Sequence, residues 1–221
     1  MLKKIIIIAV ILVLIITVAL LVIFGREDTE IKNREYDAAV VVSEAKRLIE
    51  ESEKLNELLL GEGIKYDLNP AYANGYYYRA DEFSLDTFGV TTVSDIKNLM
   101  RKTFSEGYSN QLFNSTVFTS AKDANDNIVH FARYIQKGEE NSPEYILVYS
   151  QWEPFLYDET TYDYTSVRAI ESKGEKVYVE ISCSVKDSES EKTEKKTLRV
   201  ALIEESVGWR IDSPTYCEIE K

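Results

Sequence analysis

Residues 153–164 form a short stretch, EPFLYDETTYDY, in which four acidic and four aromatic side chains occur within twelve residues. Carboxylates can bind cationic groups of a partner through charge-assisted hydrogen bonds, and aromatic rings are enriched at protein interfaces. Strand formation already explains Tyr162 and Tyr164, because tyrosine is common in strands. The remaining side chains form our candidate partner-binding site, which consists of Glu153, Phe155, Leu156, Tyr157, Asp158 and Glu159. The alternative is that the stretch is only the acidic rim of a sheet.

Catalytic chemistry has little support in the sequence. His130 is the only histidine, so it is the sole candidate for the base of a Ser-His-Asp or Cys-His unit. No motif places a nucleophile beside it, and we interpret it as a structural or surface histidine. The nine glycines form neither a G-x-G-x-x-G fingerprint nor a phosphate loop, which argues against nucleotide binding. We predict no catalytic site and no cofactor, and hence a protein that is not an enzyme.

Cys183 and Cys217 are the only two cysteines. Secreted domains that depend on disulfides usually contain more, so burial of apolar side chains must hold this fold together. The spacing of the pair is not that of a metal site or a redox motif, and we predict no metal. In an oxidising compartment the pair could bridge the last strands of a sheet. The sequence does not decide between a disulfide and two thiols.

The segment from Ile5 to Phe24 is a predicted membrane anchor. It contains no charged residue and one hydroxyl side chain, and a helix of its length spans the hydrocarbon layer of a bilayer, roughly 30 Å thick. Lys3 and Lys4 precede it, so the positive-inside bias places the N-terminus in the cytoplasm and the C-terminal domain outside the cell. A cleaved signal peptide is the alternative, but its apolar core is usually shorter and ends in a small-residue site that ALLVIFG lacks.

The remainder of the chain, residues 26–221, is acidic. It carries 24 basic and 38 acidic side chains, a net charge of −14. A phosphate backbone requires clustered Lys and Arg, so we predict no nucleic-acid partner. The charge keeps the domain soluble and favours basic partners.

Two segments have the 3.6-residue periodicity of amphipathic helices. The first lies within residues 26–63 and ends at Gly61 and Gly63; it either packs on the domain, which we prefer, or acts as a stalk. The second, TTVSDIKNLMRKTFS, begins with Thr92 and Asp95 at the spacing of a capping box, and Ser105 can cap a shorter third helix. The expected buried stripes contain Val41, Ala45, Leu48, Leu55 and Leu59 in the first helix and Val93, Ile96, Leu99, Met100 and Phe104 in the second.

Beyond residue 125 the periodicity changes from 3.6 to 2. NIVHFARYIQ, EYILVYS, TSVRAIE, KVYVEISCSV, TLRVALIEE and GWRID each predict a strand. In KVYVEISCSV one face is formed by Val177, Val179, Ile181, Cys183 and Val185. We predict an α+β fold in which helices cover one curved antiparallel sheet of about five or six strands. The expected domains are a cytoplasmic stub and anchor at 1–25, the helix or stalk at 26–63 and an extracytoplasmic α+β domain at 64–221.

The helices in TTVSDIKNLMRKTFSEGYSNQLFN, followed by the strands and GWRIDSPTY, resemble extracytoplasmic domains of Gram-positive bacteria over about residues 80–216. One group of these is the IseA-type inhibitors of cell-wall DL-endopeptidases. A wider comparison is the cone of the nuclear-transport-factor-like, or ketosteroid-isomerase-like, proteins. The resemblance implies a cystatin-like or nuclear-transport-factor-like arrangement, and a role in blocking or regulating a peptidoglycan hydrolase. IseA-type inhibitors are secreted, whereas this chain carries a predicted anchor.

Two functions are therefore expected. In the first, the protein is a membrane-anchored extracytoplasmic binding protein whose acidic, aromatic stretch plugs the Cys-His site of a cell-wall hydrolase. In the second, it is a small-ligand or sensory module that binds a wall fragment in a pocket of the cone, with Tyr76 to Tyr78 as candidate lining residues. A polar-lined internal pocket would favour the second function, and a filled core would favour recognition at the surface.

Overall fold

The computed structural model describes residues 35–68, 76–114, 117–139, 142–154, 159–186 and 192–217. These residues belong to one compact unit that begins at Glu35. Among them, no helix is both long and apolar enough to cross a membrane. The predicted anchor, Ile5 to Phe24, lies outside the described residues, so the single-pass topology stays a prediction.

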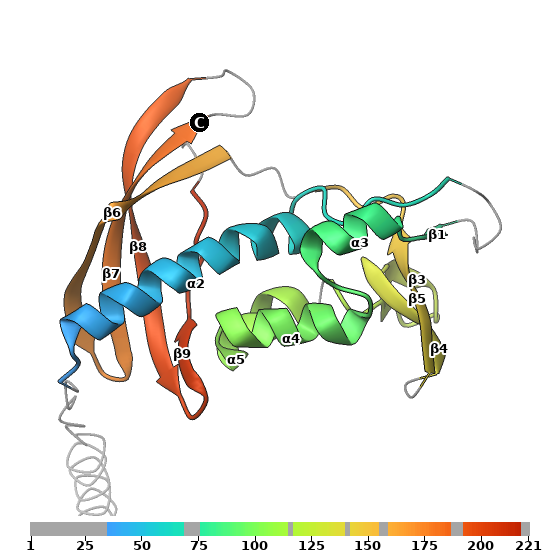
Figure 1. Cartoon of the computed structure of the whole chain (residues 1–221). Coiled ribbons are helices and arrows are strands. Elements are labelled where there is room, and N and C mark those ends of the chain that lie inside the picture. The colour runs from blue at the N-terminus through green and yellow to red at the C-terminus, as the bar shows by residue number, and fades with distance from the viewer. Residues whose placement is uncertain are drawn as a thin grey trace, which may run out of the picture. The chain divides into compact units, whose positions relative to one another are not determined.

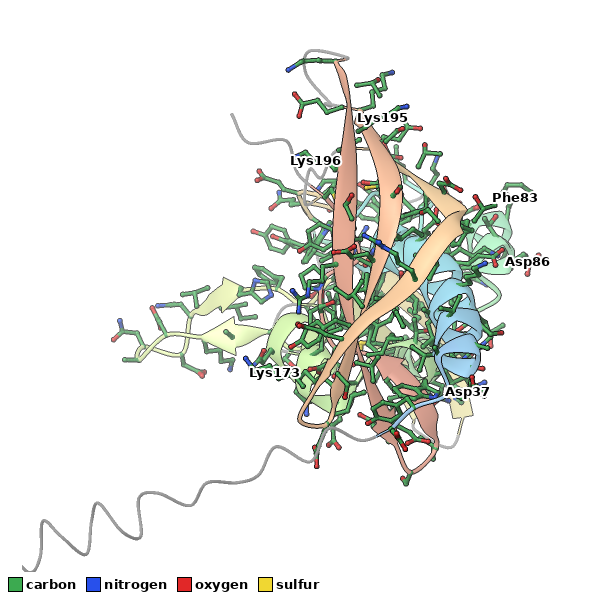
Figure 2. The ribbon with its side chains drawn as sticks, turned by 90° about the vertical axis from the view of Figure 1, so that its left-hand side faces the viewer. Asp37, Phe83, Asp86, Lys173, Lys195 and Lys196 are labelled. Atoms are coloured by element: carbon green, nitrogen blue, oxygen red, sulfur yellow. The ribbon has the colours of Figure 1, made fainter. Side chains whose placement is uncertain are left out.

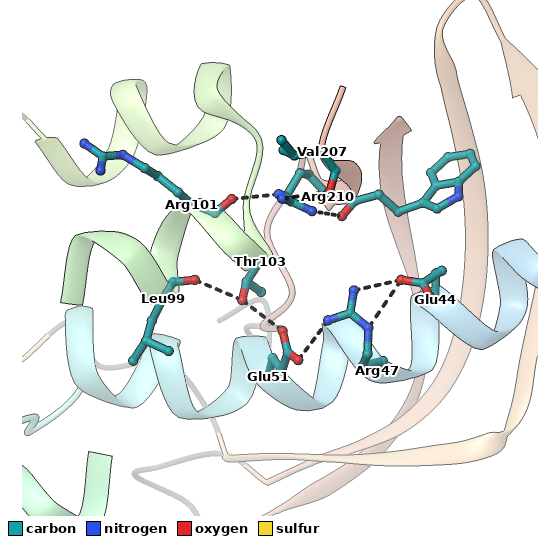
Figure 3. Close-up of polar contacts among 9 residues, drawn as sticks. Glu44, Arg47, Glu51, Leu99, Arg101, Thr103, Val207 and Arg210 are labelled. Atoms are coloured by element: carbon teal, nitrogen blue, oxygen red, sulfur yellow. Dashed lines mark hydrogen bonds and ion pairs between the residues drawn. The ribbon is translucent and has the colours of Figure 1, made fainter. Parts of the chain in front are cut away.

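Helix α2, Ala38–Leu59, is amphipathic and lies across one face of a sheet (Figure 1). Asp37 caps its first turn, because the Asp37 side chain accepts hydrogen bonds from two backbone nitrogens of that turn. All five predicted stripe residues of this helix are buried, which confirms the predicted face. On the solvent side, Arg47 forms ion pairs with Glu44 and Glu51, one turn before and one turn after it (Figure 3).

The sheet that α2 covers has four antiparallel strands in the order β6-β7-β8-β9. The strands are β6 (Glu159–Lys173), β7 (Lys176–Lys186), β8 (Thr193–Glu205) and β9 (Gly208–Ile211). The predicted alternation in β7 is confirmed, because its five predicted inward residues are buried and the residues between them are not. Three of them, Val177, Val179 and Ile181, belong to one apolar core cluster with the buried residues of α2. The space between helix and sheet is therefore filled by side chains.

A second sheet has the order β1-β5-β4, and strands β2 and β3 form a separate hairpin. The strands are β1 (Tyr77–Arg79), β2 (Ala121–Lys122), β3 (Ile128–His130), β4 (Tyr134–Glu139) and β5 (Ser142–Tyr149). The α+β class with antiparallel strands is confirmed, but the expectation of one curved sheet is wrong. The predicted strand NIVHFARYIQ is interrupted after His130, and its two halves, β3 and β4, pair with different strands.

Arg133 interrupts this predicted strand because its side chain bonds to the end of α2. It is 1% exposed, and its Nη2 donates hydrogen bonds to the carbonyl oxygens of Gly61, at 2.8 Å, and Glu62. The hydroxyl of Tyr134 donates to the carbonyl oxygen of Leu58 at 2.7 Å. A helix leaves its last carbonyls without backbone partners, and Tyr134 supplies a donor to one of them. Arg133 bonds to two carbonyls that follow the helix. We call these contacts the α2–β4 junction.

Three shorter helices and a π-helical turn follow β1: α3 (Glu82–Phe88), α4 (Val93–Thr103), α5 (Glu106–Ser109) and η2 (Asn110–Asn114). The predicted capping box is confirmed: Thr92 Oγ1 accepts from the Asp95 nitrogen at 3.1 Å, and Asp95 Oδ2 accepts from the Thr92 nitrogen at 2.8 Å. Ser105 caps α5 as expected. Helix α3 was not predicted, because its seven residues are too few to show helical periodicity within a segment interpreted as turns.

Helix α4 is attached to β9 by Arg210, which is 7% exposed. Its Nε donates to the carbonyl oxygen of Arg101 at 2.7 Å, in the last turn of α4 (Figure 3). A cation is favourable there because the C-terminal end of a helix carries a partial negative charge. From the same turn, Thr103 donates to Glu51 of α2 at 3.3 Å. Helix α4 is thereby tied both to β9 and to α2.

Asp95→Ala should lower the free energy of unfolding by about 1 kcal/mol at neutral pH, because it leaves the Thr92 nitrogen without its acceptor. Burial alone would raise the pKa of Asp95, but the hydrogen bonds from Thr91 and Thr92 outweigh it and lower the pKa. The carboxylate therefore stabilises the fold above its unfolded-state pKa of about 3.9, and this stabilisation is lost as the pH falls through the lower folded-state pKa. Urea unfolding should show the difference between wild type and variant shrinking as the pH falls below about 3.9.

The control is Asp86→Ala, which removes an exposed carboxylate from α3 (Figure 2). It should change the free energy of unfolding by less than about 0.5 kcal/mol at either pH. A cost of Asp95→Ala that does not depend on pH would contradict the role of the ionised cap.

Candidate functional site

A cavity of about 280 Å³ opens where hairpin β2-β3, the end of β5 and the turn after β5 meet. We call it the aromatic cavity. Its lining residues are Val129, His130, Phe131, Tyr149, Gln151, Trp152 and Glu153. It therefore includes the only histidine of the chain and the first residue of the predicted binding site.

Backbone hydrogen bonds bring separate segments to this cavity. The nitrogen of Tyr149, at the end of β5, donates to the carbonyl oxygen of Arg133 at 2.9 Å. In the following turn, the Ser150 nitrogen and hydroxyl donate to the carbonyl oxygen of Tyr76 at 2.8 and 2.9 Å. The Trp152 nitrogen donates back to the Tyr149 carbonyl oxygen at 3.3 Å. The turn after β5 is thus fixed at the edge of the sheet, together with the cavity residues that it carries.

Four rings pack together beside the cavity, and we call them the aromatic cluster: Tyr76, Tyr77, Phe131 and Tyr149. Phe131 and Tyr149 stack, with ring centroids 4.9 Å apart and planes at 15°. Tyr76 lies 5.3 Å from Phe131, and Tyr77 lies 5.5 Å from Tyr149. Burial raises the pKa of Tyr77, whose hydroxyl donates to the Ala132 carbonyl oxygen at 2.8 Å. Tyr76 is 44% exposed, so the cluster has a buried base and an accessible side.

A buried positive charge lies against the wall of the cavity. The guanidinium carbon of Arg133 is 4.9 Å from the Trp152 ring centroid and 5.1 Å from that of Tyr134. These distances are within the range of cation–π interactions. Because the same guanidinium bonds to the carbonyls that follow α2, the position of Trp152 depends on the α2–β4 junction.

The rim of the cavity combines polar and exposed apolar side chains. His130, Gln151 and Glu153 supply an imidazole, an amide and a carboxylate. Val129 of β3 belongs to the lining and is 64% exposed, and its neighbour Ile128, outside the lining, is 44% exposed. Apolar surface beside rings, with a few hydrogen-bonding groups, is typical of binding sites. The described lining contains no Ser, Thr or Cys, and its one hydroxyl is that of Tyr149.

The predicted binding site is only partly within the described residues. Glu153 is exposed and lines the aromatic cavity. Glu159 is exposed too, and it is the first residue of β6, where it pairs with Lys186 of β7. The strand begins earlier than Tyr162 because the backbone of residues 159–161 already pairs with β7. Outside the described residues lie Phe155, Leu156, Tyr157 and Asp158, whose part in the site stays a prediction.

The sequence interpretation missed Phe131, Tyr149 and Trp152. Each occurs within or beside a segment interpreted as a strand, where aromatic residues are common for structural reasons. The rings come from separate segments of the chain, so only the fold brings them together. The available signal was an excess of aromatic residues in NGYYYR, HFARY and VYSQW.

No protein-family model, curated protein or solved structure matches this chain. The site is therefore interpreted from its own geometry.

Tyr134→Phe should lower the free energy of unfolding by about 1–3 kcal/mol, because it leaves buried polar groups without partners. The hydroxyl donates to the Leu58 carbonyl oxygen and accepts from the Ile64 nitrogen at 3.2 Å. Since Arg133 packs against both Tyr134 and Trp152, the near-ultraviolet circular dichroism of the cavity rings should change as well. Urea unfolding and the spectrum measure the two effects.

Tyr78→Phe is the matched control, since it removes the hydroxyl of a β1 tyrosine that stacks on Tyr66 and is not part of the junction. It should cost less than about 0.5 kcal/mol. Equal costs for the two variants would contradict a special role for the Tyr134 hydroxyl.

Proposed function

We propose that this protein is a membrane-anchored extracytoplasmic binding protein of the Gram-positive cell envelope, which binds and restrains a peptidoglycan hydrolase. The observation that carries the proposal is the aromatic cavity. Its rim includes Glu153 and the exposed side chain of Val129, and the aromatic cluster lies beside it. Glu153 is also the first residue of the predicted binding site.

The filled core supports recognition at the surface. Side chains of α2, β7 and β8 occupy the space between helix and sheet, as shown by the complete burial of Leu48, Val179 and Leu202. A large ligand-binding interior would need that space to be open. The aromatic cavity lies instead at the edge of the second sheet, where a partner can reach it.

Charge gives the second support. Residues 26–221 have a net charge of −14, which favours approach to a basic surface. A Cys-His hydrolase presents a cationic histidine in a substrate groove. In the proposed complex, Glu153 and neighbouring carboxylates pair with that cation while rings of the aromatic cluster fill the groove.

The finer fold assignment belongs to the same proposal. A helix across a four-stranded antiparallel sheet agrees with the cystatin-like and nuclear-transport-factor-like cones and with the IseA-type resemblance. The anchor at Ile5 to Phe24 would hold the domain at the extracellular face of the cell membrane. There it would meet hydrolases that act on the wall.

The test is hydrolysis of peptidoglycan by a DL-endopeptidase with and without the full chain in detergent micelles. We expect wild type to slow release of wall peptides, and Tyr76→Ala and Glu153→Gln each to weaken inhibition about tenfold, the loss of roughly 1.4 kcal/mol of binding free energy. The matched controls are Phe83→Ala and Asp86→Asn, which change an exposed ring and an exposed carboxylate of α3 (Figure 2). They should inhibit like wild type. Absence of binding and inhibition by wild type, or equal effects of site and control variants, would contradict the proposal.

A second candidate is binding of a small wall fragment, favoured by the size of the cavity. About 280 Å³ is close to the lower end of the range for small-molecule sites, and ring faces can stack on the apolar faces of sugars. A glycan fragment that raises the melting temperature of wild type, but not of Phe131→Ala, would favour this function over hydrolase binding.

A further inference from the structure

The two cysteines, far apart in sequence, meet in the fold. Cys183 lies in β7 and Cys217 follows β9, yet their sulfur atoms are 3.9 Å apart. Cys183 is 5% exposed and belongs to the buried face of β7. No group of three His, Cys, Asp or Glu side chains that could hold a metal occurs among the described residues. The chemistry open to two thiols in contact is therefore that of the pair itself.

Cys217 is held beside Cys183 by the segment that carries it, residues 212–217, which we call the tail. The Asp212 nitrogen donates to the Ala201 carbonyl oxygen at 2.8 Å, and the Ala201 nitrogen donates to Ser213 Oγ at 2.9 Å. The tail thus begins as a continuation of the pairing with β8. These two hydrogen bonds with Ala201 direct the tail toward Cys183.

Thr215 anchors the middle of the tail between α2 and β6. It is 1% exposed. Its hydroxyl oxygen accepts from Asn56 Nδ2 of α2 at 3.0 Å, and its carbonyl oxygen accepts from the hydroxyl of Tyr162. Two residues later the chain reaches Cys217. Contacts with α2 and β6 therefore hold the tail in place before any covalent bond forms.

We propose that Cys183 and Cys217 form a disulfide that locks the tail onto β7, so that the tail acts as a redox-controlled latch on the edge of the core. A disulfide requires sulfur atoms about 2 Å apart, and thiols already in contact can reach this by rotation about their side-chain bonds. The inference is independent of the proposed hydrolase binding, because it needs only a disulfide oxidant.

A groove gives such an oxidant access. About 540 Å³ in volume, it is lined by residues of β6, β7 and β8 that include Tyr162, Cys183, Lys195 and Lys196. The two lysines lie toward the β7–β8 end of the sheet, away from Lys173 at the β6–β7 turn (Figure 2). The groove therefore gives access from solvent to Cys183. Burial raises the pKa of Cys183, and the charge of Lys196 offsets only part of that rise.

The reaction is thiol–disulfide exchange in two steps. The more exposed Cys217 attacks one sulfur of a small disulfide, and the other half leaves as a thiol carrying the Cys217 proton. Cys183 then attacks the Cys217 sulfur of this mixed disulfide, and the second half leaves with the Cys183 proton. The two cysteines are oxidised to one disulfide, and the small disulfide is reduced to two thiols.

The reduced pair should react slowly in the folded protein at neutral pH, and faster as the pH rises. Burial raises the pKa of Cys217 to about 12 and also raises that of Cys183, so both sulfurs keep their protons at neutral pH. Thiols must therefore be counted after denaturation. Conversely, the closed disulfide joins residues 34 positions apart and restricts the unfolded chain, which should raise the melting temperature by roughly 5–15 °C.

The test uses the full chain in detergent, reduced and then incubated with oxidised glutathione. We expect the intact mass to fall by two hydrogens, denatured oxidised protein to resist alkylation, and peptide mapping to give one Cys183–Cys217 crosslink within a single chain. The oxidised form should melt above the reduced form. Cys217→Ser should have the melting temperature of reduced wild type, and a reductant should not change it. The comparison of oxidised with reduced wild type needs no substitution, so it does not depend on how a variant folds.

Three results would overturn the latch. They are persistence of two free thiols in oxidised glutathione, formation of only glutathione adducts or crosslinks between chains, and an intramolecular disulfide that leaves the melting temperature unchanged.

Discussion

Burial of one face of helix α2 is the interaction on which both sheets depend. A sheet with one apolar face and a helix with one apolar stripe each need the other to remove that surface from water. With 22 residues, α2 is about 33 Å long, enough to cover the four-stranded sheet and still reach the start of β4. Val179 of one sheet and Ile146 of the other consequently belong to the same core cluster.

The end of α2 decides where the candidate site forms. Tyr134 donates to a carbonyl of the last turn of α2, and Arg133 donates to the carbonyls that follow it, where the predicted strand is interrupted. Gly63, with φ at +64°, allows the close approach, since a side chain there would collide with both. The interruption releases Phe131 from the sheet ladder and lets its ring stack on Tyr149. The aromatic cavity thus depends on the contacts that Arg133 and Tyr134 make at the end of α2.

Because side chains fill the interior, the candidate sites for binding and reaction lie at the surface. The aromatic cavity and the groove beside Cys183 both open to solvent, and both take side chains from segments distant in sequence. The rings and the few polar groups of the cavity lining suit binding. The groove instead reaches a thiol pair. The proposed recognition and the proposed redox chemistry therefore depend on different parts of the fold.

The sequence by itself determined the elements whose signals are local. Period 3.6 in α2, the Thr92–Asp95 cap and period 2 in β7 each depend on neighbouring residues, and all three were predicted. Tertiary structure alone decided the division into two sheets, the meeting of Cys183 with Cys217 and the gathering of the aromatic cluster. These three features depend on which groups, distant in sequence, form hydrogen bonds with each other or bury each other's apolar surface. These pairings form only when the whole core assembles, so local sequence patterns do not predict them.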